Sequence, residues 1–266
     1  NSSFGEYNIR KQKMPVEGRN ETIMGEEREN RKRSRRQRKN KNRRMTLRQK
    51  TLALLTLDTI LLIAVLITGG MLMARWYREK NRPRLSELTA PEWYTQDFLQ
   101  INPYSRPGTK RREINHIVVH YVANPGTTAA QNRSYFNNLA NQTGEKATSA
   151  SSHYIIGIDG EILQCIPLDE VAYANYPRNE DTVSIECCHP DASGEFSSET
   201  IEALKKLTGW LCAELNLTER DIIRHYDVVG KNCPKYYVEH EDAWKSLKKE
   251  MGEAVKQAKQ EKRDRE

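Results

Sequence analysis

The sequence predicts an α/β domain with a single mixed central β-sheet flanked by helices, preceded by a disordered basic tail and one transmembrane helix. Two observations predict the domain: β-branched runs typical of buried strands alternate with helix-like segments, and an Asp-Gly pair joins two strands as a hairpin. A third observation, a run of 23 mostly apolar residues, predicts the membrane span. We therefore expect a tail at 1–50, a transmembrane helix at 51–76, a linker at 77–112 and one folded domain at 113–262.

The basic charge of the chain is concentrated in its first 50 residues. The formal net charge is +7, and residues 1–50 hold 17 Lys and Arg against 6 Asp and Glu. Residues 31–44 contain ten basic side chains and no apolar one, so they cannot form a core and we expect disorder. Such a tail can bind nucleic acid or anionic lipid. Because it lies beside the apolar run, we expect lipid headgroups and no specific nucleic-acid partner.

Residues 52–74 predict a helix that crosses the membrane. They correspond to about 35 Å of helix, against a hydrocarbon core of about 30 Å. The run contains one ionisable residue, Asp58, and no small-residue cleavage site follows it, so we expect an uncleaved anchor. Residues 31–50 carry twelve Lys and Arg, and residues 75–84 carry five. This bias predicts a single-pass protein of the cell membrane with a cytoplasmic N-terminus and an extracellular domain.

The linker and the strands follow in order. Residues 77–112 are rich in Pro, Arg and polar residues, with two apolar pairs, Trp93-Tyr94 and Phe98-Leu99, that are able to pack on the domain. Asp159-Gly160 supplies the left-handed conformations that a tight two-residue hairpin turn requires. The predicted strands are 114–123, 153–158, 161–166, 182–187 and 222–223.

Three segments predict helices. The first covers 127–139, with Thr127 or Thr128 as its N-cap. The second starts at Ser197 or Ser198 and places apolar residues on one face at helical spacing. These residues are Ile201, Leu204, Leu207, Leu211 and Leu215. The third covers 241–259 and is a charged terminal helix. Its anchoring residues are Trp244, Leu247 and Met251.

Cysteine usage does not indicate a disulfide framework. The total is odd and two cysteines are adjacent, although an extracellular domain permits disulfides. We expect buried free thiols at Cys165, Cys187, Cys188 and Cys212.

Three residues suggest a metal site. His120 ends the strand-like run Ile117-Val118-Val119-His120, and His225 and Cys233 bound one short loop about a hundred residues later. Two imidazoles and one thiolate can hold a tetrahedral zinc ion and leave its fourth position for water, which separates catalytic from closed structural sites. Water becomes more acidic on such a metal, so the set predicts a hydrolase. Any one of these residues alone is more typical of a structural role.

Two further residues fit hydrolytic chemistry. Glu186 lies on a strand suited to burial, which would raise its pKa toward the range of a general base, or it is a buried carboxylate paired with a basic group. Lys231, two residues before Cys233, would favour the thiolate and could stabilise an oxyanion or pair with Glu186. Of the other histidines, we expect His116 to be solvated and His153 to lie near the site. We expect His189 in a turn and His240 on the surface.

Four segments carry a resemblance to a known family. They are Ile117-Val118-Val119-His120, Ser152-His153-Tyr154, Val183-Ser184-Ile185-Glu186 and the stretch from His225 to Pro234. In this order and spacing, over residues 113–250, they resemble the type 2 N-acetylmuramoyl-L-alanine amidases, which include phage amidase lysozymes and peptidoglycan recognition proteins. The resemblance implies a bacterial zinc enzyme that hydrolyses the amide between N-acetylmuramic acid and L-alanine in peptidoglycan.

Position by position, His120, His225 and Cys233 are similar to the family's metal ligands, and Glu186 and Lys231 to its acid/base and oxyanion residues. Two positions depart from the pattern. Ser152 stands where the phage lysozymes have a catalytic tyrosine, and Tyr173-Ala174 stands where many members have Trp-His. The alternative is a non-catalytic peptidoglycan-binding module. Such members usually lose the cysteine ligand, which this chain keeps.

Overall fold

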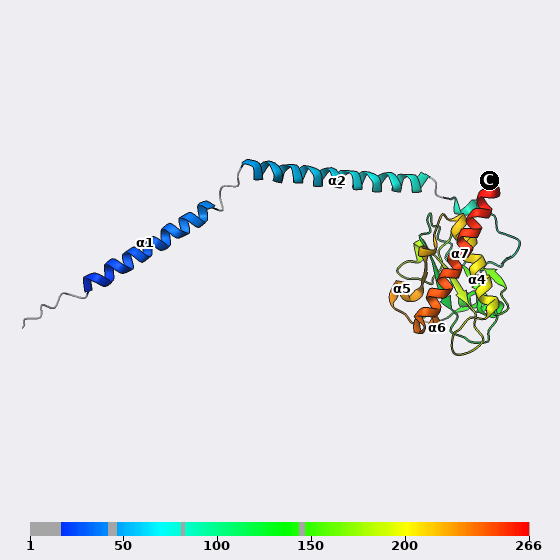
Figure 1. Ribbon diagram of the computed structural model, residues 1–266. Coiled ribbons are helices and arrows are strands. Elements are labelled where there is room, and N and C mark those ends of the chain that lie inside the picture. Colours follow the sequence, from blue (N-terminus) through cyan, green and yellow to red (C-terminus); the bar gives the residue numbers. More distant parts are fainter. Residues whose placement is uncertain (1–16, 42–46, 81–82, 144–146, 266) are drawn as a thin grey trace, which may run out of the picture. The chain divides into compact units, whose positions relative to one another are not determined.

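The computed structural model describes residues 17–41, 47–80, 83–143 and 147–265, and it divides the chain into two units, 1–76 and 77–266 (Figure 1). Each unit is described by itself. The first contains helix α1 (Glu17–Lys41) and most of helix α2 (Leu47–Lys80).

Helix α1 occupies much of the tail that we expected to be disordered, so this prediction is wrong for residues 17–41. Its described side chains are all exposed, and no apolar face organises the helix. Unbranched Glu, Arg, Lys and Gln side chains favour a helix intrinsically, and Glu29 and Arg33 form an ion pair of 3.8 Å at i,i+4 spacing. Most of its acidic residues lie in its first half and its basic residues in its second, which suits the helix dipole. Residues 1–16 and 42–46 of the tail lie outside the described residues.

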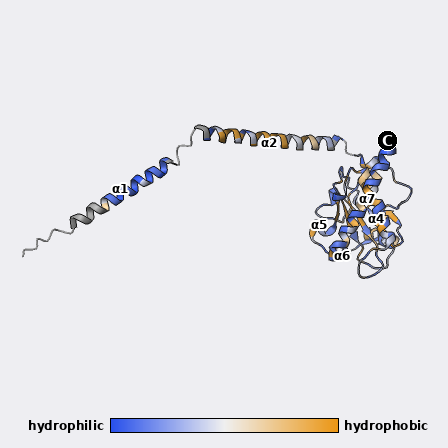
Figure 2. Cartoon of the chain, in the orientation of Figure 1, coloured by the Kyte–Doolittle hydropathy of each residue, from blue (hydrophilic) through white to orange (hydrophobic). Residues whose placement is uncertain are grey.

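Helix α2 contains the predicted membrane span. Residues Gln49–Tyr77 form a helix long and apolar enough to cross a membrane by length and composition, and hydropathic colouring shows the apolar band along it (Figure 2). The hydroxyls of Thr56 and Thr59 donate to carbonyls one turn earlier, at 2.9 and 2.8 Å. These hydroxyl groups are thus paired within the helix, as a hydrocarbon environment would require.

The second unit is built on a six-stranded sheet, and the predicted mixed α/β fold is confirmed. Only the β3–β4 pair is antiparallel within this sheet, and the other pairs are parallel. In spatial order the strands are β1 (Thr95–Gln96), β4 (Ile162–Gln164), β3 (Tyr154–Ile156), β5 (Thr182–Cys187), β2 (His116–Tyr121) and β6 (Ile222–Arg224).

Register brings distant residues together at one edge of the sheet. Along the parallel β2–β5 pair, His120 lies opposite Glu186. Along the β2–β6 pair, Val119 lies opposite Arg224, so His225 begins just beyond the end of β6. The carboxyl ends of β2, β5 and β6 therefore meet, as expected for parallel neighbours at a ligand-binding edge.

Helices cover both faces of the sheet. Alternate residues of a strand point to opposite faces, and the apolar core divides accordingly: Tyr154 and Ile156 belong to one cluster and Ile155 to the other. The first cluster includes the buried faces of the neighbouring helices α4 and α7 (Figure 1), and the second includes α3. The helices of this unit are α3 (Ala129–Asn138), α4 (Ser198–Glu214), α5 (His225–Val229), α6 (Lys235–Glu239) and α7 (Glu241–Arg265). Short 3₁₀ turns are η1 (Leu85–Glu87), η2 (Leu139–Asn141), η3 (Asn179–Asp181) and η4 (Glu219–Asp221).

The helix predictions are largely confirmed. Thr128 caps α3 in a capping box with Gln131, and Ser197 caps α4 by accepting from the Thr200 N–H. On the predicted face of α4 only Ile201 is half-buried, and the other four residues are buried. The terminal helix extends to Arg265, beyond the predicted end, and Lys262 pairs with Glu214 of α4 at 2.9 Å. All five cysteines are buried free thiols, which confirms the expectation for the four outside the proposed site.

The hairpin turn is longer than predicted. The Gly157 N–H donates to the Glu161 carbonyl at 2.8 Å, so three residues form the loop, and Gly160 adopts a left-handed φ of +81° at its end. The hairpin therefore has a three-residue loop whose last residue is left-handed, and not the two-residue turn that we expected. A Cβ on Gly160 would lie 2.9 Å from the Glu199 carbonyl oxygen, so the close approach to α4 also requires glycine.

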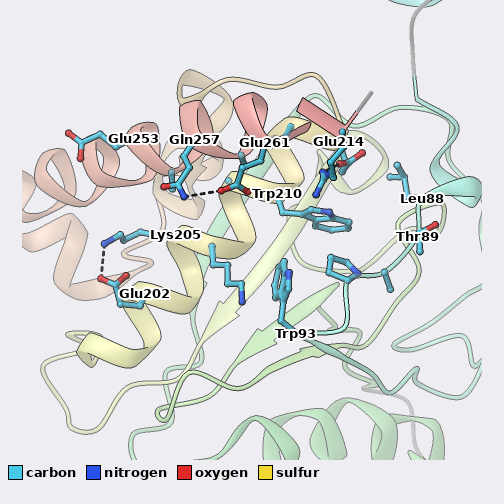
Figure 3. A pocket seen from close by; sticks show the side chains of 18 of the residues that line it. Leu88, Thr89, Trp93, Glu202, Lys205, Trp210, Glu214, Glu253, Gln257 and Glu261 are labelled. Carbon is cyan, nitrogen blue, oxygen red and sulfur yellow. Dashed lines mark hydrogen bonds and ion pairs between the residues drawn. The ribbon is translucent and has the colours of Figure 1, made fainter. Parts of the chain in front are cut away.

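The predicted linker is part of the folded unit, and the prediction is wrong from Leu85 onward. Leu85, Tyr94 and Leu99 are buried, and β1 adds an edge strand beside β4. The Trp93 ring packs edge-to-face on Trp210 of α4, with centroids 6.2 Å apart. Both indoles line a groove of about 1060 Å³ between residues 87–93, α4 and α7. Figure 3 shows the two side chains there. The contacts with β4 and α4 join residues that are far apart in the sequence, so the local composition of this segment could not reveal them.

Candidate metal centre

Three of the predicted residues meet at the edge where β2 and β6 end. His120 is the penultimate residue of β2, His225 opens α5 directly after β6, and Cys233 lies between α5 and α6. One potential ligand atom from each lies within 4.8 Å of the other two, and all three residues are buried. His120 Nδ1 is 3.7 Å from Cys233 Sγ, and the two imidazole centroids are 4.5 Å apart.

One closed loop carries His225 and Cys233. The Tyr226 N–H donates to the Cys233 carbonyl at 2.9 Å, and α5 ends at Gly230, whose φ of +71° suits glycine. Beneath the loop, buried Arg224 donates to the carboxylate of Asp227 and to the Tyr237 carbonyl. The spacing of His225 and Cys233 therefore corresponds to the short helix α5 followed by the few residues that bring the chain back beside Tyr226.

Burial controls the protonation of the three side chains. It lowers the pKa of His120 to about 3, assisted by His225, and lowers the pKa of His225 to about 4, assisted by Lys231. Both imidazoles are thus neutral at neutral pH, the form that binds metals. Burial and Glu186 raise the pKa of the Cys233 thiol to about 12. Lys231 lowers that pKa, as expected, but burial outweighs it, so Lys231 alone does not produce the thiolate.

The side chains fit a zinc ion. Two imidazole nitrogens and one sulfur are the donor set of zinc, and bonds of about 2.0–2.3 Å place tetrahedral ligands at separations of this size. The buried Nδ1 of His225 has no hydrogen-bond partner among the described residues. A cation between the three groups would pair that atom and favour the thiolate of Cys233.

Glu186 lies beside this cluster, on β5. Its Oε1 is 3.9 Å from His120 Nδ1, and its buried Oε2 has no hydrogen-bond partner within the part of the chain that the structure describes. Burial raises the pKa of Glu186 to about 8, while Lys231 lowers it. The carboxyl group is therefore placed and tuned to exchange a proton near neutral pH.

Lys231 is exposed on the loop before Cys233. Its charge lowers the pKa of His120, His225, Glu186 and Cys233. The alternative that Lys231 forms an ion pair with Glu186 is not seen among the described residues.

Asn175 is a site residue that sequence reasoning missed. It is 1% exposed, and its Oδ1 lies 2.7 Å from His120 Nε2. The loop before β5, where the resemblance left a histidine in doubt, thus contributes an amide two residues after Tyr173. A single polar residue in an irregular loop produces no periodic pattern. The departure at Tyr173-Ala174 was the one signal that pointed to this loop.

Other candidates lie outside the cluster. Ser152 is buried and its hydroxyl lies 2.9 Å from the carbonyls of Tyr154 and Ser184, a structural arrangement. His153 is buried between Ser184 and the Glu170 carbonyl, each at 3.1 Å. His116, expected to be solvated, is half-buried because the Arg178 guanidinium donates to it at 2.9 Å. His189 is buried in the loop after β5, and His240 is exposed as predicted.

Comparison with known proteins agrees with this architecture. A family model described as N-acetylmuramoyl-L-alanine amidase matches residues 110–236. The amidase CwlL of Bacillus licheniformis is 33% identical over 168 residues, covering 59% of this chain and 46% of the relative. The amidase BlyA of Bacillus subtilis (strain 168) is 31% identical over 176 residues, covering 58% and 46%. The chain therefore spans about half the length of the curated relatives it matches.

A solved structure supports the same assignment. The catalytic domain of XlyA superposes with a TM-score of 0.50 and 28% identity, covering 60% of this chain and 99% of that domain. The matched region contains His120, Glu186, His225, Lys231 and Cys233, together with Asn175. Residues 110–236 therefore form a domain that matches the N-acetylmuramoyl-L-alanine amidase family, and CwlL, BlyA and the XlyA catalytic domain are similar to this chain.

Proposed function

We propose that this chain is a membrane-anchored, zinc-dependent amidase that hydrolyses the bond between N-acetylmuramic acid and L-alanine in peptidoglycan. The observation that carries the proposal is the meeting of His120, His225 and Cys233 beside Glu186 within the family domain. The relatives named above are N-acetylmuramoyl-L-alanine amidases, which supports the substrate class.

His120, His225 and Cys233 would hold the metal. When bound, zinc supplies Lewis acidity toward the scissile carbonyl and lowers the pKa of water. His120 comes from β2, and His225 and Cys233 come from the closed loop that follows β6, so the three side chains hold their positions with little rearrangement.

Glu186 would move the proton. Its Oε2, which no described residue contacts by a hydrogen bond, accepts a proton from the attacking water as the new C–O bond forms. It returns the proton to the nitrogen of L-alanine as the C–N bond breaks. The products are the lactyl carboxyl group and a free stem-peptide amine. Lys231 would stabilise the negative charge that develops on the carbonyl oxygen.

Helix α2 would anchor the domain at the membrane of its own bacterium. The apolar run supports anchoring, and the excess of Lys and Arg before it supports a cytoplasmic N-terminus with the amidase domain outside, facing the wall. Its partners would then be peptidoglycan and the lipid bilayer.

Digestion of purified peptidoglycan tests the proposal. The full chain in detergent, loaded with zinc, should release stem peptides with a new N-terminal L-alanine, detected by mass spectrometry. The Cys233→Ala variant should lose this release because it lacks one of three ligands. Unchanged turnover in that variant would exclude the proposed centre. Binding of peptidoglycan without any cleavage by the unmodified chain would favour the non-catalytic module.

A further inference from the structure

The hydrogen bonds around His120 determine which of its nitrogens faces the cluster. Nδ1 lies toward Cys233 and Glu186, whereas Nε2 lies 2.7 Å from the side-chain oxygen of Asn175. A neutral imidazole carries a proton on one nitrogen only, and the other nitrogen offers a lone pair. The group facing Nε2 therefore decides what Nδ1 presents.

A chain of donors fixes the orientation of the Asn175 amide. The Thr182 hydroxyl donates its single proton to the Arg178 carbonyl at 2.7 Å. It can then only accept from Asn175, whose Nδ2 donates to it at 2.8 Å. The amide nitrogen is thus committed to Thr182, and the amide oxygen is left facing His120. Because that oxygen only accepts, His120 must carry its proton on Nε2.

We infer that Asn175 is a positioning residue that holds His120 in the tautomer with a free Nδ1 lone pair directed at the metal. This inference rests on the proposed zinc site but not on the reaction proposed there. Partners of this kind orient metal-binding histidines in many proteins, where carboxylates and backbone carbonyls are the usual acceptors. Here a neutral amide takes that place.

The surrounding loop is built to hold Asn175 still. Its backbone N–H donates to the Asn179 side-chain oxygen at 2.6 Å, and the Ala174 N–H donates to the same oxygen at 3.2 Å. Asn175 and Thr182 are both buried, so water does not compete for these bonds. Asn179 thereby supports the loop without contacting His120, which makes it a matched control.

Zinc affinity of the full chain in detergent is the primary test. Asn175→Leu keeps the branched shape of the side chain but removes the acceptor, and we expect zinc affinity to fall by about 10- to 100-fold, measured by chelator competition. Asn175→Asp restores an acceptor and should bind zinc within a few-fold of the unmodified chain. Asn179→Ala loosens the loop without removing the acceptor of Asn175, so it should lower thermal stability and should lower zinc affinity by less than Asn175→Leu does. Unchanged affinity in Asn175→Leu, or equal loss in Asn175→Leu and Asn175→Asp, would overturn the inference.

A measurement on the unmodified protein does not depend on how a variant folds. In the zinc-loaded chain with ¹⁵N-labelled histidine, NMR should show His120 with its metal on Nδ1 and its proton on Nε2. Metal on Nε2 would refute the positioning role. Both readouts concern zinc binding and not cleavage. A chain that cleaves no peptidoglycan but binds zinc through Nδ1 of His120 would therefore contradict the proposed reaction and still support the role of Asn175.

Discussion

At the scale of single residues, burial sets the proton chemistry of the site more strongly than neighbouring charges do. The pKa of Glu186 rises to about 8 although Lys231 lowers it, and the pKa of Cys233 rises to about 12 despite the same lysine. The two effects suit different tasks. A carboxyl group that titrates near neutral pH exchanges protons readily, while a protonated thiol becomes a ligand only when a cation replaces its proton.

Glu186→Gln separates proton transfer from metal binding. The amide keeps the shape of the side chain but cannot take a proton, so we expect turnover to fall by roughly 10²-fold or more with zinc content unchanged. Rates of peptidoglycan digestion and metal analysis of the same sample measure both quantities. The control is Glu180→Gln, an exposed residue just before β5, which should behave like the unmodified chain. A rate near normal for Glu186→Gln would assign this residue a structural role.

At the scale of elements, the site depends on parallel strands that cannot shift. β2 and β5 pair along their whole length, and both are covered on one face by α4 and α7. A slip of one residue would turn His120 and Glu186 to opposite faces of the sheet. The helices that bury this face therefore also secure the geometry of the cluster.

Leu207→Ala tests how much α4 contributes. Leu207 is fully buried against the sheet, so the truncation should reduce the free energy of unfolding by about 2–5 kcal/mol. Ile201→Ala, on the same helix but half-buried, should cost less. Urea denaturation of both variants gives the comparison. Equal losses at the two positions would contradict the packing described for α4.

The segment predicted as a linker is tied to the domain by a buried carboxylate. Glu170 accepts from Arg106 at 2.7 and 3.0 Å and from Lys110 at 3.3 Å. The Arg106 bonds are the main cause that lowers the pKa of Glu170 below its usual 4.5. The stability that Glu170 contributes is therefore fully present above its unfolded pKa of 4.5. It is lost as the pH falls through the lower pKa of the folded state.

Glu170→Gln should flatten the acid side of the stability profile. The variant should be less stable than the unmodified chain at pH about 7, and the difference should shrink as the pH falls below the usual pKa of a glutamate and through the lower folded pKa of Glu170. Urea denaturation across this pH range measures it. Glu253→Gln, on the exposed side of α7, provides the control. A difference that stays constant with pH would show that Glu170 acts through its shape alone.

At the scale of the whole molecule, the apolar helix α2 and the folded domain have separate structural bases. The first core cluster begins at Leu85 and contains no residue of α2, whose described side chains are all exposed. Each unit therefore has its own source of stability: packing for the domain, and lipid for the apolar helix under the proposed anchoring.

Deletion of residues 52–74 tests the anchor. Without its apolar run, the chain should move from the membrane fraction to the soluble fraction after cell lysis, while the domain keeps its melting temperature because its core is intact. Immunoblotting of the fractions and thermal unfolding give the two readouts. Retention of the shortened chain in alkali-washed membranes would indicate a different mode of attachment.

Local patterns in the sequence predicted much of the fold and the site. The strand at Thr182–Cys187 has the predicted bounds, and Thr128 and Ser197 cap their helices, because a β-branched run or a capping side chain acts on its immediate neighbours. His120, His225 and Cys233 could be proposed as a set because each sits at a strand end or in a loop directly after one. The helix at 17–41 was missed because an absent apolar face was taken to mean disorder, although intrinsic propensity favours a helix there.

The sequence by itself determined which residues could form a zinc site, the order of β2 to β6 with α3, α4 and α7, and the presence of a membrane-length apolar run. Only the tertiary structure decided that residues 85–112 complete the domain, that Glu186 lies beside His120, and that Asn175 holds the second nitrogen of that histidine. These features depend on contacts between residues far apart in the chain. Burial and hydrogen-bond direction, which set the pKa values and the tautomer, exist only once those residues are packed together.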